Sequence, residues 1–134
     1  MQIKRIFLVL MLLATAVFCQ GCVVVAVGLG AAGTVAYVRG DLESTEPKNI
    51  EVVYSAALQA AEQLELRVIS KSKDALSAEI IARDAQDKKI TIKMNSVSEQ
   101  TTKLSIRVGT FGSEAKSQQI YQKIYDNINP IKTK

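Results

Sequence analysis

The chain has no histidine and no tryptophan among its 134 residues, and only 5% of its residues are aromatic. Without histidine it lacks the usual general base near neutral pH, the usual zinc ligand and the partner of a Ser-His or Cys-His pair. Sparse aromatics argue against the base-stacking surfaces that bind single-stranded nucleic acid. We therefore expect no histidine-based enzyme, no metal, no cofactor and no nucleic-acid partner.

Cysteine is also scarce, since Cys19 and Cys22 are the only two and both precede residue 23. The rest of the chain has no disulfide available, so a domain built from it depends on its hydrophobic core alone. The net charge is +4, but no charged residue lies between Arg5 and Arg39, and all 13 acids follow that gap. The part from Asp41 onward is therefore nearly neutral, and the basicity is too mild to indicate nucleic-acid binding.

The amino-terminal segment has the pattern of an export signal. Lys4 and Arg5 precede an apolar run from Ile6 to Phe18, which has the length of a signal-peptide core and is short for a membrane-spanning helix. Gly21-Cys22 follows, and a small residue before a cysteine at this place resembles the lipobox of bacterial lipoproteins. Cys19 departs from that pattern, which usually has an aliphatic residue three positions before the lipidated cysteine.

The resemblance implies cleavage before Cys22, a diacylglycerol thioether on its sulfur and an acylated amino terminus. It divides the chain into a signal peptide at 1–21, a lipid-anchored glycine-rich tether at 22–35 and a domain at 36–134. Val23 after the cysteine, in place of Asp, is similar to outer-membrane sorting signals. The expected location is the bacterial cell envelope, on the periplasmic side of the outer membrane. The alternative is an uncleaved membrane anchor over Ile6–Val25.

The tether contains Gly28, Gly30 and Gly33, which fit the dinucleotide-binding pattern G-x-G-x-x-G. That fold also needs a helix opened by the third glycine and a second strand, but Gly40 and Pro47 follow too soon for either. The small residues instead permit close backbone packing, in the bilayer or between copies of the chain. A plain spacer remains the other interpretation.

The remaining sequence alternates between helical and strand periodicity. Apolar residues at helical spacing predict one helix over Asn49–Leu64, capped by Asn49, and a second helix that starts at Ser113-Glu114 and ends before Pro130. Tyr121 and Tyr125 fall on the apolar side of the second helix and are expected in the core. Alternation of period two predicts strands over 66–70, 76–82, 90–94 and 102–108, and a further strand is expected over Tyr37–Thr45.

The predicted fold is α+β, with an antiparallel sheet of about five strands and two helices on one face. The segments AYVRGDLE at 36–43, SKSKDALSAEI at 70–80 and IRVGTFG at 106–112, with the glycine-rich spacer, resemble a family of small bacterial lipoproteins catalogued only as a domain of unknown function. That resemblance implies an envelope location and supplies no activity or catalytic residue. The element order also looks like TBP-like or helix-grip modules, an analogy of fold alone.

One sheet face is the main candidate binding surface. If the apolar strand residues face the helices, the opposite face carries a set of basic residues against Glu79: Arg67, Lys71, Lys73, Arg83, Lys93, Lys103 and Arg107. Such a face would bind anions, such as lipid headgroup phosphates, glycan carboxylates or an acidic envelope protein. The alternative is an ordinary solvated face whose charges prevent aggregation.

Two loops and one serine are weaker candidates. Gly109-Thr110-Phe111-Gly112 suits a partner-binding loop if the phenylalanine is exposed, although we expect it to pack beneath the turn. Asp84 and Asp87 near a hairpin tip attract a cation only with further ligands. Ser113 at a helix start would be the nucleophile of a hydrolase, but no histidine exists to activate it. The sequence thus favours a non-catalytic binding module whose partner and oligomeric state it does not specify.

Overall fold

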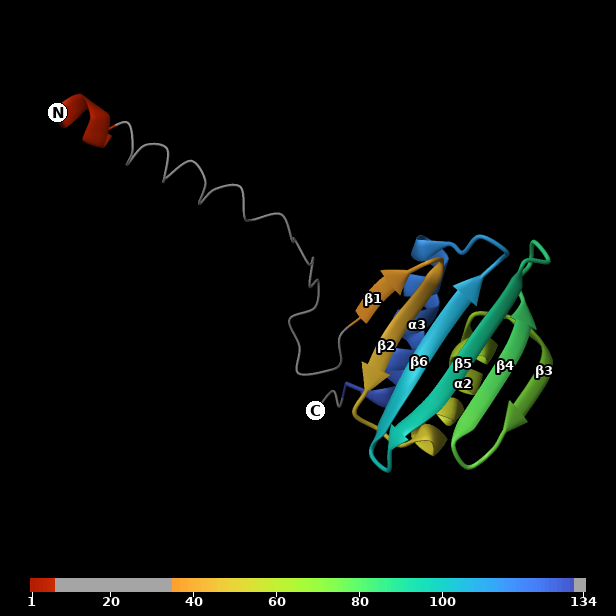
Figure 1. Ribbon diagram of the computed structural model, residues 1–134. Helices are drawn as coiled ribbons and strands as arrows, with labels where there is room; N and C mark the ends of the chain where they lie inside the picture. The colour runs from red at the N-terminus through yellow and green to blue at the C-terminus, as the bar shows by residue number, and fades with distance from the viewer. Residues whose placement is uncertain (7–34, 132–134) are drawn as a thin grey trace.

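The computed structural model describes residues 1–6 and 35–131. Residues 2–6 form a short helical segment. The other elements are β1 (Val35–Val38), β2 (Asp41–Glu46), α2 (Ile50–Gln63), β3 (Arg67–Lys73), β4 (Ser77–Arg83), β5 (Lys89–Ser98), β6 (Thr101–Val108) and α3 (Glu114–Ile128). Within the described ranges, the six strands form one antiparallel sheet in the order β1-β2-β6-β5-β4-β3, and α2 and α3 cover one face of it (Figure 1). The predicted α+β class and antiparallel sheet are confirmed.

The path of the chain explains this strand order. Helix α2 carries the chain from β2 across the sheet to its opposite edge, where β3 begins. Three hairpins then lead back through β4 and β5 to β6. Strand β6 pairs with β2 and so joins the first hairpin to the rest of the sheet. Helix α3 follows β6 and runs beside α2 on the same face (Figure 1).

The expected single strand over Tyr37–Thr45 is wrong, because these residues belong to a hairpin. Arg39 and Gly40 form its two-residue turn, with φ angles of 53° and 89°, and this adds the sixth strand. Two consecutive residues in the left-handed region match the right-handed twist of the paired strands, and glycine adopts such angles without strain. The Arg-Gly pair between two β-prone segments was the signal for this turn.

The core lies between the sheet and the two helices. Both helices have nearly the predicted bounds, and the Asn49 side chain caps α2 by accepting a 3.0 Å hydrogen bond from the Val52 amide. Alanines on the buried side of α2 allow close packing against isoleucines and other aliphatic residues of the sheet. Asn127 of α3 donates a hydrogen bond of 3.2 Å to the Ala56 carbonyl, which joins the two helices.

A β-bulge in β3 changes the side on which two lysines lie. Val68 pairs with Ala82 but Ser70 pairs with Ile81, so one extra residue interrupts the register. After the bulge Lys71 and Lys73 lie opposite Ile80 and Ala78, whose side chains are buried on the helix-covered side. The expectation that these lysines share the outer face with Arg67 is therefore wrong, because period-two alternation assumes uninterrupted pairing.

The predicted lipidation residue Cys22, its neighbour Gly21 and the glycines of the tether lie outside the described residues. In the part of the chain that the structure describes, no helix is long and apolar enough to cross a membrane.

Candidate functional site

Two glycines bring two distant loops into contact at one end of the sheet. The β1–β2 turn contains Gly40, and the loop between β6 and α3 ends at Gly112, with φ of 85°. A Cβ atom on Gly112 would overlap the backbone of Gly40 and lie 2.6 Å from the hydroxyl oxygen of Tyr37. A Cβ atom on Gly40 would lie 2.6 Å from the Phe111 carbonyl oxygen. Only residues without side chains fit here, so the backbones of the two loops pack directly on each other.

The Arg107 guanidinium holds the same two loops together. Its Nη1 donates to Asp41 Oδ1 at 2.8 Å and to the Arg39 carbonyl at 3.2 Å. Its Nη2 donates to the Thr110 carbonyl at 3.0 Å. One planar, permanently charged group thus connects β2, the β1–β2 turn and the β6–α3 loop, which suits the fixed fork of donors on arginine.

The loop that these contacts hold displays Phe111 to solvent. Its side chain is 92% exposed, so the expectation that it packs beneath the turn is wrong. The backbone of Phe111 lies against Gly40. Val38 and Tyr37, at the end of β1, are 46% and 36% exposed near the same turn, and as consecutive strand residues they face opposite sides of the sheet. We call Tyr37, Val38 and Phe111 the apolar tip.

The apolar tip is costly to leave in water. Burying a phenylalanine side chain stabilises a protein by about 1.5–3 kcal/mol. Because Phe111 is exposed, the domain does not gain this stabilisation on folding. Exposed large apolar side chains on a backbone that is held in place are typical of protein interfaces, since little backbone entropy is lost on binding. The tip therefore has the properties of a preformed contact surface.

A second cluster, which the sequence analysis missed, is polar and buried. The hydroxyls of Ser44 and Tyr121 both donate to Glu46 Oε1, the tyrosine at 3.0 Å. Ser44 and Glu46 are each 1% exposed and point from β2 toward α3. Because side chains alternate along a strand, Leu42, Ser44 and Glu46 all face the helices. This spacing of two residues was the sequence pattern from which the cluster could have been predicted.

This cluster combines a hydroxyl and a carboxylate but is closed to substrate. Glu46 Oε2 and Ser117 Oγ are buried and have no hydrogen-bond partner among the described residues. Burial, together with charge repulsion from the Glu46 carboxylate, raises the pKa of Tyr121 to about 12. The arrangement joins α3 to β2, and its Ser44 and Glu46 are each only 1% exposed.

The outer sheet face carries the predicted basic residues other than Lys71 and Lys73, and acids lie beside them. Four pairs form there: Arg107 with Asp41, Lys103 with Glu43, Lys93 with Glu79, and Arg83 with Asp87. Two of these acids belong to β2, whose position beside β6 the strand pattern did not reveal. Arg67 also contacts Asp87, while Lys73 contacts Glu51 of α2. Anion binding by Arg67, Lys71, Arg83, Lys93, Lys103 and Arg107 stays a prediction.

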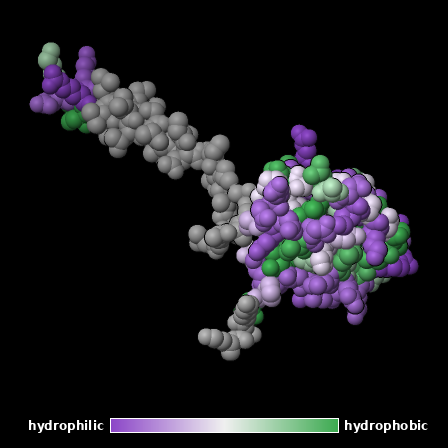
Figure 2. Space-filling model, turned by 90° about the horizontal axis from the view of Figure 1, so that it is seen from below, coloured by the Kyte–Doolittle hydropathy of each residue, from purple (hydrophilic) through white to green (hydrophobic). Residues whose placement is uncertain are grey.

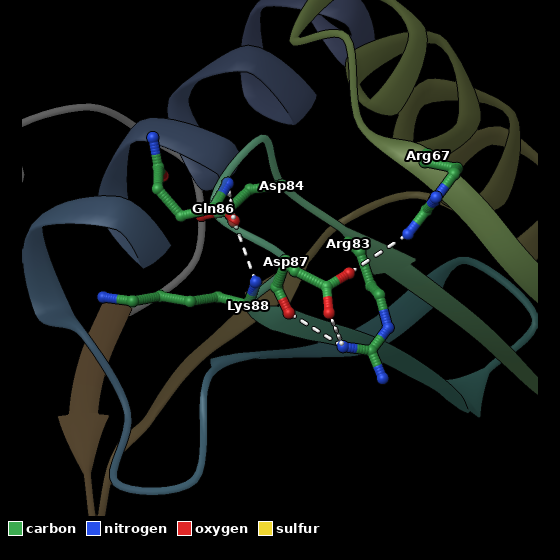
Figure 3. A network of polar contacts seen from close by, with 6 residues as sticks. All are labelled: Arg67, Arg83, Asp84, Gln86, Asp87 and Lys88. Atoms are coloured by element: carbon green, nitrogen blue, oxygen red, sulfur yellow. Dashed lines mark hydrogen bonds and ion pairs between the residues drawn. The ribbon is translucent and has the colours of Figure 1, made fainter.

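The carboxylate oxygens of Asp84 and Asp87 form hydrogen bonds and ion pairs within the protein (Figure 3). The Asp87 carboxylate lies between Arg67 and Arg83, at 3.1 and 3.0 Å. Asp84 Oδ1 accepts the Gln86 and Lys88 amides, each at 2.9 Å. The Lys116 ammonium hydrogen-bonds Asp84 and holds the pKa of that carboxyl below its usual value. Among the described residues no group of three or more potential ligands could hold a metal ion.

Ser113, the candidate nucleophile, is the N-cap residue of α3. Its side chain makes no capping hydrogen bond.

Comparison with known proteins places this architecture in a family. The family model described as "Protein of unknown function (DUF3568)" matches residues 5–127. The chain belongs to this family. The DUF3568 match extends from the amino-terminal apolar segment into α3, so it includes both glycine loops and the apolar tip. No curated protein matches the chain.

The glycine contact of this DUF3568 chain is testable with Gly112→Ala. An alanine in the left-handed region costs about 1–2 kcal/mol in any protein. At residue 112 the overlap with the Gly40 backbone should add roughly 1–3 kcal/mol, as in overpacked cores. The matched control is Gly109→Ala, where φ is 73° but no atom lies within 4 Å of the new Cβ. Chemical denaturation should give Gly112→Ala the lower free energy of unfolding of these two variants. Equal losses of stability would contradict the contact between Gly112 and Gly40.

The buried tyrosine predicts a change of stability at high pH. Because the pKa of Tyr121 rises from 10.0 to about 12 on folding, the folded chain retains a proton that the unfolded chain releases. The resulting stabilisation is complete below pH 10 and is lost between pH 10 and about 12. In Tyr121→Phe, the free energy of unfolding should decline less steeply with pH over this range. Tyr125→Phe, one turn away, keeps the Tyr121 hydroxyl and should retain the wild-type slope; a flattened slope there would disprove the assignment.

Proposed function

We propose that the chain is a lipid-anchored protein of the bacterial envelope whose α+β domain is a non-catalytic binding module. The observation that carries the binding role is the 92% exposure of Phe111 in a loop held by Gly40, Gly112 and Arg107. A solvent-exposed ring on a rigid support favours recognition of a protein partner with an apolar pocket. The amino-terminal sequence up to Cys22 supports the lipid anchor.

The position of the apolar tip fits this role. β1 begins at Val35, level with Ser44 of β2 and Leu104 of β6, and leads to the turn at Arg39 and Gly40 (Figure 1). Phe111 follows β6 at the end of the sheet where this turn lies. If Cys22 carries the lipid, the tether of residues 23–34 reaches on the order of 40 Å when extended, which is enough to hold the tip clear of the membrane.

The polar features of the domain support binding over catalysis. Ser44 and Glu46 are buried together, so this serine-carboxylate contact is shielded from substrate. The basic side chains of the outer face have acidic neighbours, and exposed ion pairs of this kind contribute about 0–1 kcal/mol each. For these reasons the apolar tip, and not the outer face, is the surface on which we base the proposal.

The anchor is tested by the intact mass of the protein extracted from membranes. We expect the mass of residues 22–134 plus a diacylglycerol group and acyl chains, because thioether formation precedes cleavage at a lipobox cysteine. A Cys22→Ser variant should keep its full-length mass without lipid. A Cys19→Ser variant is the matched control, since cleavage removes that residue, and its product should equal the wild type. An unmodified full-length wild-type mass would establish the uncleaved anchor instead.

Binding by the tip is tested by placing a photo-crosslinking amino acid at residue 111 of the full chain in its native envelope. A partner crosslinked there should then bind the purified wild-type chain at least about 30-fold more tightly than Phe111→Ala, the loss typical of a central interface residue. Ile69, which is 54% exposed on β3, is the control site for both the crosslinker and the alanine substitution. Equal affinity of wild type and Phe111→Ala would reject the tip as the binding surface.

A further inference from the structure

The end of the sheet opposite the apolar tip carries an open hollow. The β3–β4 and β5–β6 turns lie side by side at this end, because Ser77 pairs with Asn95 and Ser98 with Thr101 (Figure 1). The hollow has a volume of about 350 Å³. Figure 2 shows this end of the domain, where hydrophobic patches lie among hydrophilic side chains. We call it the far-end hollow, and its apolar lining consists of Ile50, Ala75, Leu76 and Val97.

Two aliphatic side chains of the far-end hollow are exposed to water. Leu76 is 70% exposed and Val97 is 65% exposed. Val97 is the extra residue of a β-bulge between Ser96 and Ser98, and a bulge turns a side chain out of the regular alternation. The Ser96 amide donates a 2.8 Å hydrogen bond to the Leu76 carbonyl. This backbone contact joins the two turns and so holds the two exposed side chains near each other.

The far-end hollow has room for a phenylalanine ring. A cavity of about 150 Å³ lined by aliphatic and aromatic side chains holds one benzene molecule, and the hollow is larger than this. Phe111 is the most exposed aromatic side chain of the described residues. It lies at the other end of the sheet, and the ten residues of β5 span about 34 Å at about 3.4 Å each. Phe111 is therefore too far away to enter the hollow of its own domain.

The charges beside the two surfaces are opposite in sign. Arg39 is exposed in the turn that follows Val38 of the apolar tip, and Glu99 is exposed in the lining of the far-end hollow. None of the ion pairs among the described residues uses Arg39 or Glu99. Asp74 adds a second acid in the β3–β4 turn, and Lys48 adds a base before α2. Opposite charges beside two apolar surfaces favour one partner and one orientation.

We infer that the partner of the apolar tip is a second copy of this chain, whose far-end hollow binds the Phe111 ring. The inference rests on the proposed function and names its partner. Because the tip and the hollow lie at opposite ends of one domain, the contact is head to tail. Each bound copy then presents a tip or a hollow to a further copy.

The point where the chain enters the domain is compatible with such a row of copies. Val35 lies level with Ser44 and Leu104, in the middle rows of the sheet, so contacts at both ends leave it uncovered. One aromatic ring and two aliphatic side chains make a small contact. Attachment of the chains to one membrane would raise their effective concentration and so favour the association.

A photo-crosslinking amino acid at residue 111 of the full chain in its native envelope identifies the partner. We expect covalent multimers whose masses increase by one chain at a time, because a head-to-tail contact does not end at a dimer. Digestion of the covalent dimer should place the crosslink at residues 75–76 or 97–99 of the second copy. The same amino acid at Ile69, which is 54% exposed on β3, should give no multimers.

A mixture of two defective chains tests the head-to-tail geometry. Phe111→Ala removes the ring, and Leu76→Arg places in the hollow a charge of the same sign as Arg39. Both sites are exposed, so both variants should melt like the wild type. Val97→Ser is a second hollow variant that keeps Leu76.

Association is measured by amine-reactive crosslinking of the full chains in phosphatidylcholine vesicles. Each variant alone should give at least about tenfold fewer multimers than the wild type, the loss typical of a central interface residue. The mixture of Phe111→Ala with Leu76→Arg has one intact tip and one intact hollow for each pair, so it should form dimers and no longer species. The chain that carries both substitutions is the matched control and should stay monomeric.

These outcomes separate failure of this inference from failure of the proposed function. A crosslink from residue 111 to a different protein would overturn the second copy as partner and leave the tip as a binding surface. A crosslink to the tip of another copy would overturn the hollow as its binding site. Absence of dimers in the mixture would overturn the head-to-tail contact. A crosslinker at 111 that captures no protein would reject the tip and this inference together.

Discussion

The direct packing of Gly40 on Gly112 is the constraint on which the functional end of the domain depends. The β1–β2 turn and the β6–α3 loop are far apart in sequence and meet backbone to backbone, where no Cβ atom fits. Arg107 completes the junction by donating to carbonyls of both loops and to the Asp41 carboxylate. Phe111, in the loop that this junction holds, is 92% exposed.

The buried side of the same junction is stabilised by a different chemistry. Further along β2, Ser44 and Glu46 face α3, and the Tyr121 hydroxyl completes the contact at 3.0 Å from Glu46 Oε1. A buried carboxylate is tolerated when donors surround it, and its partners must then hold their positions. Strand β2 is therefore tied to β6 by its ladder and to α3 by this cluster. The loop that carries Phe111 connects β6 to α3, so both of its ends are attached to the same strand.

Exposed apolar side chains lie at both ends of the sheet. One end carries a phenylalanine on a two-glycine loop, and the other carries Leu76 and Val97 on joined hairpins. Exposed apolar groups at both ends are unfavourable for a free domain in water. The two faces of the sheet also differ, with paired charges on the outer face and the helices on the inner one (Figure 1).

Local patterns in the sequence determined the two long helices, the meander from β3 to β6 and the α+β class, because helix caps and period-two alternation act over a few residues. They did not reveal the β1–β2 hairpin, the bulges that redirect Lys73 and Val97, or the acids that β2 brings beside Arg107 and Lys103. Strand adjacency and register arise from pairing between distant segments, so composition cannot indicate them. The exposure of Phe111 is of the same kind. The sequence shows a phenylalanine between glycines, and only the tertiary structure, in which Gly112 packs on the distant Gly40, shows that Phe111 faces water.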